Sequence, residues 1–197
     1  GTLLATLRFI RNHLINFRLA VPSIFAAILG SSLGAKISML VPEKIMLYVL
    51  VFILPLSAFL VLNKKIFHDK GSEIVILDKK TYLTAILSAF FIGGYDGFYG
   101  PGTGTFLIIA FTVCAHLSIP TANAQAKIIN LTTNITALAV FLINGQTLLP
   151  LGIAAALCNM AGGYLGAGLV MKNGAKIVKP SILFVLFLLF LKILGVY

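Results

Sequence analysis

Residues 93–104 read Gly-Gly-Tyr-Asp-Gly-Phe-Tyr-Gly-Pro-Gly-Thr-Gly and interrupt an apolar stretch that extends from 82 to 117. Six glycines and one proline within twelve residues disfavour a regular helix, because glycine is conformationally free and proline removes a backbone donor. The whole stretch is too long for one ordinary crossing, which needs about 20 residues. The sequence therefore predicts a broken segment, with helical pieces over about 82–92 and 105–117 that are each short for a full span.

The composition places this broken segment in an integral membrane protein. Of the 197 residues, 59% are hydrophobic and 10% are charged, and the mean hydropathy is +1.05. Such a chain has lipid as its main solvent and leaves little length for a soluble domain. We expect an all-α, polytopic transmembrane helix bundle, with membrane segments near 1–10, 19–41, 45–63, 82–117, 126–144, 149–171 and 180–197.

The charges indicate how the chain crosses the membrane. Fifteen Lys and Arg against five Asp and Glu give a net charge of +10, and the basic residues gather in short segments between apolar runs. This clustering is typical of cytoplasmic loops and argues against a nucleic-acid partner. If 82–117 entered and returned, the loops around Arg11, Lys64 and Lys172 would all be cytoplasmic and Tyr197 would lie outside. We therefore predict a re-entrant hairpin or two short crossings.

The reactive side chains predict neither catalysis nor metal binding. Cys114 and Cys158 lie in apolar stretches without metal-ligand spacing, so they indicate packing rather than a disulfide or zinc site. His13, His68 and His116 are scattered along the chain. We expect no enzyme activity and no cofactor.

Two glycine pairs predict close helix packing. Gly30 and Gly34 form one small-xxx-small motif, and Gly162 and Gly166 form another. Such pairs let helix backbones approach closely in membranes. We expect a structural role for these four glycines rather than contact with a substrate.

Asp96 is the only acidic residue within a predicted membrane segment. A carboxylate at bilayer depth costs on the order of 2.5–3.5 kcal/mol on insertion scales unless it is paired or hydrated. One interpretation makes Asp96 a proton carrier or a gate element in transport. The other makes it a cap or turn residue that accepts hydrogen bonds from backbone N–H groups freed by the glycines.

The residues after the break form the first half of a candidate substrate path. A second half-helix that opens over 101–105 would direct unsatisfied N–H groups into the break, where they favour an anion. The alternative is a tight structural corner. The residues of this segment that we assign to the path are Gly100, Gly102, Thr103 and Thr105.

The helix predicted over 126–144 carries the second half of the path. Lys127, Asn130 and Asn134 are spaced so that they share one face. In lipid, a polar stripe of this kind should face the bundle interior or a water-filled path. Lys127 would attract an anion or extend to the cytoplasmic interface, and the asparagines would line the path or bond to other helices. Three threonines widen the patch: Thr132, Thr133 and Thr136.

Three stretches carry a resemblance to a known family. The run from Gly93 to Phe106, the run from Ala122 to Asn130, and Thr133-Asn134-Ile135 together resemble the second-half signature of the TauE/SafE, or sulfite exporter, family. The basic segment 172–180 and the final apolar helix are also similar to that family.

The resemblance implies two related halves in opposite orientation, an inverted repeat of the kind found in transporters. Residues 1–80 would be the remainder of the first half, which lacks its own Gly-rich segment, and residues 81–197 would be the second half. Gly1 to Arg11 look like the end of a helix, so we expect an N-terminal region to be missing.

The function implied by the resemblance is export of sulfite, thiosulfate, sulfoacetate or similar anions across the bacterial inner membrane. The expected partners are the lipid bilayer and a small anion, with a homo-oligomer left open. The competing hypothesis is a non-transporting integral membrane assembly partner, in which the glycine pairs serve packing alone.

Overall fold

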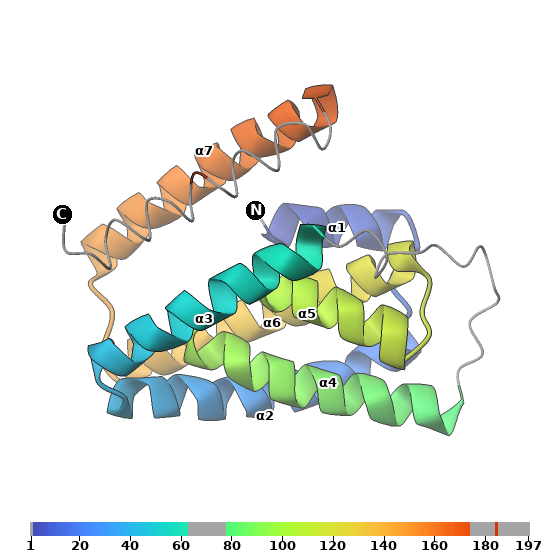
Figure 1. The fold of residues 1–197 in the computed structure, drawn as a ribbon, viewed down its shortest axis with the longest axis horizontal. Coiled ribbons are helices and arrows are strands. Elements are labelled where there is room, and N and C mark those ends of the chain that lie inside the picture. Colours follow the sequence, from blue (N-terminus) through green and yellow to red (C-terminus); the bar gives the residue numbers. More distant parts are fainter. Residues whose placement is uncertain (1, 63–77, 174–183, 185–197) are drawn as a thin grey trace.

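The computed structural model describes residues 2–62, 78–173 and 184, and the described residues form helices without strands (Figure 1). The fold is thus the all-α bundle that the composition predicts. In chain order the helices are α1 (Thr2–Arg11), α2 (Phe17–Leu40), α3 (Glu43–Leu62), α4 (Lys79–Phe98), α5 (Thr103–Ile109), the π-helix η1 (Ala110–Cys114), α6 (Ile119–Ile143) and α7 (Leu149–Asn173).

Most predicted segments match these helices within a few residues. The largest difference at a helix start is in α6, which begins at Ile119 rather than near residue 126. Pro120 lies in its first turn, where a proline has no hydrogen bond to lose. Apart from Phe184, the predicted segment 180–197 lies outside the described residues, and so do the basic residues Lys64 and Lys176.

The prediction that the helix before the break ends near residue 92 is wrong. Helix α4 continues through Gly93, Gly94 and Gly97 to Phe98. These glycines do not break the helix, because they serve as its contact surface with α2. The actual interruption is the short turn 99–102.

Helices α2 and α4 pack backbone against backbone. A Cβ atom added at Gly30 would collide with the carbonyl oxygen of Phe90, and one added at Gly34 would collide with that of Gly94. From the other side, a Cβ at Gly97 would collide with the carbonyl oxygen of Ser31. Only glycine fits at positions 30, 34 and 97. We call the contact made by Gly30, Gly34, Gly94 and Gly97 the glycine seam.

The sides of α2 differ in a way that suits a lipid surrounding. Its buried side is made mainly of small residues, and large apolar side chains face outward. A soluble bundle would bury the large side chains, whereas packing in a membrane favours small residues at the contact. The large exposed side chains are Phe17, Val21, Phe25, Ile28, Leu29, Leu33, Ile37 and Leu40.

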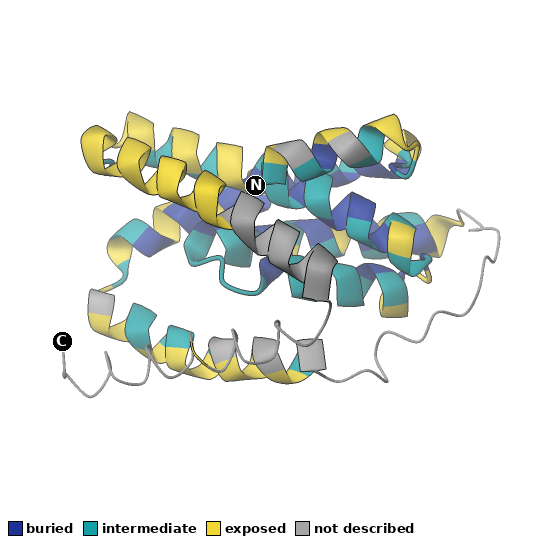
Figure 2. Ribbon diagram, turned by 90° about the horizontal axis from the view of Figure 1, so that it is seen from above, coloured by how far each residue is buried: buried dark blue, intermediate teal, exposed yellow. Residues whose placement is uncertain are grey.

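Two described helices, Phe17–Leu40 and Ile119–Ile143, are long and apolar enough to cross a membrane. They form the centre of the bundle together with α4, and Figure 2 shows that the buried residues gather there. Helix α7 is mostly exposed and packs against none of the other described helices. A Cβ at Gly162 would have no described atom within 4 Å, and the surroundings of Gly166 lie outside the described residues.

The chain enters and returns across the break, as the charge pattern predicts. Helices α4 and α5 run in opposite directions, so α4 and α6 begin at the same end of the bundle, where α1 also leads into α2 (Figure 1). Arg11, Arg18 and Lys79 gather at this basic end.

Candidate functional site

The break between α4 and α5 is a closed turn with defined bonds. Gly100 and Gly102 have φ of 91° and 85°, a left-handed conformation that favours glycine. The Tyr95 hydroxyl donates to the carbonyl oxygen of Pro101 at 2.6 Å, and the Thr103 hydroxyl donates to that of Gly100 at 2.6 Å. Bonds from both helices thus hold the turn.

Asp96 lies one turn before the break, and its carboxylate reaches α6. Its Oδ2 accepts a hydrogen bond from the Asn130 amide at 3.0 Å and another from the Thr133 hydroxyl. The side chain of Thr103, at the start of α5, lies near this carboxylate, while its hydroxyl donates to Gly100. We call Asp96, Thr103, Asn130 and Thr133 the Asp96 cluster.

Gly100 lies directly beside this cluster. A Cβ atom at Gly100 would stand 3.2 Å from Oδ1 of Asp96. A side chain at residue 100 would therefore crowd the carboxylate of Asp96.

Helix α2 also contacts the cluster, through Thr133. Thr133 is fully buried, and the Ser31 hydroxyl of α2 donates to its carbonyl oxygen at 2.9 Å. A Cβ at Gly93 would lie 3.1 Å from Cγ2 of Thr133. Helices α2, α4 and α6 therefore converge at the level of Asp96.

The cluster lies deep in the bundle. Asn130 comes 11 positions after Ile119, the start of α6, which corresponds to roughly 17 Å along the helix. The hydrocarbon core of a bilayer is about 30 Å thick. Measured from the start of α6, the cluster therefore lies about half of that thickness along the helix. Transporters bind their substrates near the middle of the membrane, beside interrupted helices.

The structure brings together four of the predicted path residues: Asp96, Gly100, Thr103 and Asn130. Gly102 lies in the same turn and sets the start of α5. The carboxylate of Asp96 bonds to side chains of α6, which differs from the predicted role as a backbone cap.

Three other predicted path residues lie apart from the carboxylate. Asn134 is exposed, and its amide donates to the carbonyl oxygen of Asn130 at 2.6 Å. Lys127 is half-buried, and its carbonyl oxygen accepts a bond from Thr6 of α1 at 3.3 Å. Thr105 is half-buried within α5.

Sequence reasoning underestimated Thr133 and Tyr95. Thr133 was only one of three threonines that widened the polar face, yet it is the one that bonds to Asp96. Its spacing of three residues from Asn130 was the available signal, because positions i and i+3 share a helix face. Tyr95, whose ring also packs 5.8 Å from Phe106, carried no signal in the sequence.

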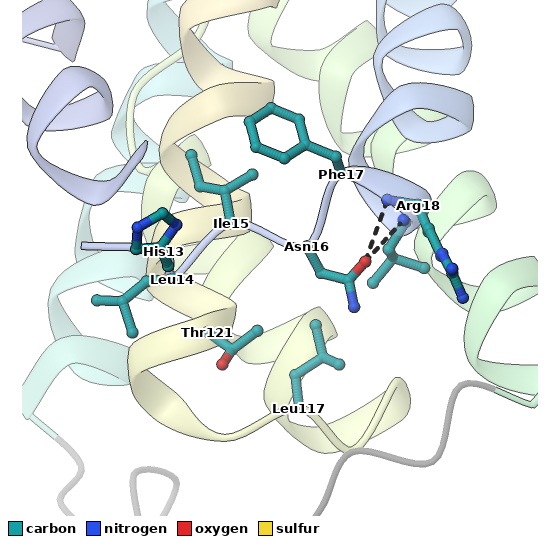
Figure 3. A pocket seen from close by; sticks show the side chains of 9 residues that line it. His13, Leu14, Ile15, Asn16, Phe17, Arg18, Leu117 and Thr121 are labelled. Carbon is teal, nitrogen blue, oxygen red and sulfur yellow. Dashed lines mark hydrogen bonds between the residues drawn. The ribbon is translucent and has the colours of Figure 1, made fainter. Parts of the chain in front are cut away.

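A separate hollow of about 550 Å³ opens at the basic end of the bundle (Figure 3). Asn16, which caps α2 by accepting from the N–H groups of Arg18 and Leu19, forms part of its wall. Gln125 of α6 donates to the carbonyl oxygen of Asn16 at 2.9 Å. The lining residues are His13, Leu14, Ile15, Asn16, Phe17, Arg18, Leu19, Leu117 and Thr121.

Metal-binding geometry is not found in the described residues. No three His, Cys, Asp or Glu side chains there lie close enough together to hold an ion. Cys114 and Cys158 are exposed and unbonded to each other.

Similar proteins carry names that describe membrane transport. A "probable membrane transporter protein" of Haemophilus influenzae is 31% identical over 194 residues, which cover 96% of this chain and 73% of that protein. A "probable membrane transporter protein ORF9" of a Sinorhizobium species is 30% identical, covering 97% and 72%. "Probable membrane transporter protein YfcA" of Escherichia coli K12 is 27% identical, covering 94% and 68%.

No solved structure matches the chain significantly. The sequence profile described as "Sulfite exporter TauE/SafE" matches residues 1–193, nearly the whole chain. The names of the relatives indicate a membrane transporter rather than an enzyme. The chain belongs to the TauE/SafE sulfite exporter family of membrane proteins.

Proposed function

We propose that this protein is a multi-pass transporter of the bacterial inner membrane that exports small sulfur-containing anions such as sulfite or organosulfonates. Family membership and the names of the relatives support transport. The choice of a sulfur-containing anion follows the name of the family, and the direction of transport and the identity of the membrane are part of the proposal.

The observation that carries the proposal is the meeting of a broken helix with a polar helix face deep in an apolar bundle. The turn at Gly100 and Gly102 and the amide of Asn130 both adjoin Asp96. Polar groups in a membrane are costly, so they are rare there and often mark the path of a substrate or an ion. We assign the substrate path to the space beside the Asp96 cluster and the turn.

The basic end supports export rather than import. Arg18 lines the hollow there, and Arg11 and Lys79 lie at the same end. A group of cations raises the local concentration of anions and speeds their entry. By the positive-inside rule this end is cytoplasmic, so anions would be collected from the cytoplasm.

Flux through reconstituted protein tests the proposal. Proteoliposomes loaded with ³⁵S-sulfite are diluted into sulfite-free buffer, and release is compared with that from protein-free liposomes. We expect protein-dependent release, with thiosulfate and sulfoacetate competing and glucose having no effect.

Two asparagines on α6 provide a matched pair for the site. Asn130→Ala removes a side chain that bonds to Asp96, whereas Asn134→Ala removes an exposed amide four residues later. We expect at least a tenfold loss of flux in Asn130→Ala and near-normal flux in Asn134→Ala. Equal flux in both variants would contradict the site, and absence of flux of all three anions in the unmodified protein would favour the assembly-partner hypothesis.

A further inference from the structure

The carboxylate of Asp96 is surrounded by neutral hydrogen-bond donors. Its described hydrogen-bond donors are the amide of Asn130 and the hydroxyl of Thr133. In the described part of the chain no lysine or arginine pairs with it. A carboxyl group held only by neutral donors changes the net charge of its site by one whenever it binds or releases a proton.

The other titratable and charged groups on neighbouring elements are few. Tyr95 and Tyr99 flank Asp96 on α4 itself, and helix α5 has no charged residue. Helix α2 contributes Arg18 at its first turn and Lys36, which is exposed near its other end. Helix α6 contributes Lys127, one turn before Asn130. Among the described residues, Asp96 is the one acid at this level of the bundle.

Thr133 has more than one acceptor for its single hydroxyl proton. Besides Asp96, the carbonyl oxygens of Asn130 and Ile129 lie 3.0 Å and 3.2 Å from its Oγ1. A hydroxyl bonds more strongly to an ionised carboxylate than to a neutral group. When Asp96 is protonated, the hydroxyl can return to the carbonyl oxygens of its own helix without losing a bond.

We propose that Asp96 binds the proton that drives transport, and that its ionised form ties α4 to α6 at the break through Thr133. Proton binding at Oδ2 converts the carboxylate to a neutral acid and releases the Thr133 hydroxyl to α6. The contact between α4 and α6 then loosens, and release of the proton restores it. Asp96 is partly exposed, and we assign to this exposed side the route by which water delivers and removes the proton. This inference rests on the proposed function and names its coupling ion.

A substrate-free measurement tests the switch. The chain contains no tryptophan, so Tyr99→Trp places a single fluorescent reporter in the turn next to Asp96. We expect its emission to change with pH in one transition, and we expect Tyr99→Trp/Asp96→Asn to lose that transition.

Asp78→Asn is the matched control, because Asp78 is the other acid described on α4 and lies at its exposed start. The transition should persist in Tyr99→Trp/Asp78→Asn. A transition that survives Asp96→Asn, or no transition in the reporter protein, would overturn the proposal. This result does not depend on sulfite, so it separates the inference from the proposed substrate.

A second variant keeps the test sound if Asp96→Asn folds poorly. Thr133→Val preserves the shape of the side chain and removes one donor to the ionised carboxylate. Bonds to charged groups contribute about 1.5–3 kcal/mol, so the emission midpoint should move to higher pH by about 1–2 units. An unchanged midpoint would contradict the role of Thr133.

Flux separates proton binding from substrate binding. Asp96→Asn mimics the protonated form and cannot release a proton, so we expect its exchange of labelled for unlabelled sulfite to be independent of pH. Accumulation of sulfite driven by a pH difference should fall at least tenfold. Accumulation at the normal rate in Asp96→Asn would overturn proton coupling even if sulfite is the substrate.

Discussion

The two faces of α4 make opposite kinds of contact. Toward α2 the helix presents Gly94 and Gly97, which bring the two backbones together. Toward α6 it presents Asp96, which bonds through side chains to Asn130 and Thr133. Close backbone packing holds the face toward α2. Hydrogen bonds whose partners can change hold the face toward α6.

The difference shows how one helix can combine a rigid contact with an adjustable one. Two closely packed backbones have no second arrangement of similar energy, because every displacement loses van der Waals contact. A neutral hydroxyl with several acceptors within reach can exchange them at little cost. We therefore expect motion at the break to occur on the α6 side while the glycine seam stays closed.

The largest expected effect is on the glycine seam. Gly34→Ala places a methyl group against the carbonyl oxygen of Gly94, which forces α2 and α4 apart. Overpacking of this kind costs about 1–3 kcal/mol, and a backbone obstacle places it at the upper end. Thermal unfolding in detergent should show a large fall in the midpoint.

Gly104→Ala is the control for the seam. A Cβ there would meet nothing within 4 Å, and residue 104 lies in α5. Alanine at a helical position without obstruction stabilises by about 0.4–1 kcal/mol. Equal stability of Gly34→Ala and Gly104→Ala would contradict the close backbone contact between α2 and α4.

The next effect concerns the turn beside the Asp96 cluster. Gly100→Ala puts a side chain into a left-handed conformation at a cost of about 1–2 kcal/mol, and its Cβ crowds Oδ1 of Asp96. We expect a moderate loss of stability together with a loss of anion flux, both measured on the same preparation.

Gly145→Ala separates strain from crowding. Gly145 also has a positive φ, 66°, but a Cβ there would have no neighbour within 4 Å. This variant should show a similar loss of stability with normal flux. If it lost flux as well, backbone strain in general and not the carboxylate would explain the result at Gly100.

A smaller effect is expected where α2 supports α6. Ser31→Ala removes the hydroxyl that donates to the carbonyl oxygen of Thr133. A hydrogen bond of this kind contributes about 0.5–1.5 kcal/mol. Unfolding should detect this loss, while the emission transition of the Tyr99→Trp reporter should keep its midpoint; a displaced midpoint would show that α2 also governs the switch.

The smallest effect is at the exposed start of α4. The backbone N–H of Thr81, and then its hydroxyl, bond to Asp78 and lower the pKa of that carboxyl group below its ordinary value. A lowered pKa in the folded state means that the ionised group contributes stability above about pH 4. The contribution is lost as the pH falls through the lowered pKa.

Asp78→Asn should remove this part of the pH dependence, because asparagine caps a helix without titrating. Stability measured in detergent from pH 6 downward checks it. If the variant and the unmodified protein lost stability equally as the pH falls, the Asp78 cap would make no contribution.

Several features of the site were predictable because they depend on local chemistry. Asp96 was identified as a lone acid in an apolar segment, and Asn130 was placed on a polar face by its helical spacing. The glycines of 93–97 misled the prediction, because glycine disfavours an isolated helix yet favours a helix that packs against another backbone. Their effect depends on α2, which lies more than 50 residues earlier in the chain.

The sequence by itself determined the all-helical membrane bundle, the basic end and the presence of an interruption within 93–104, since these follow from hydropathy, charge and backbone preference within short windows. Only the tertiary structure decided that α4 continues to Phe98, that the seam joins α2 to α4, and that Thr133 rather than Asn134 meets Asp96. Both residues are compatible with the polar face of α6, and the rotation of that helix against α4 is set by packing with α2. The physical reason is that periodicity defines a helix face, whereas contacts between distant helices select the side chains that meet there.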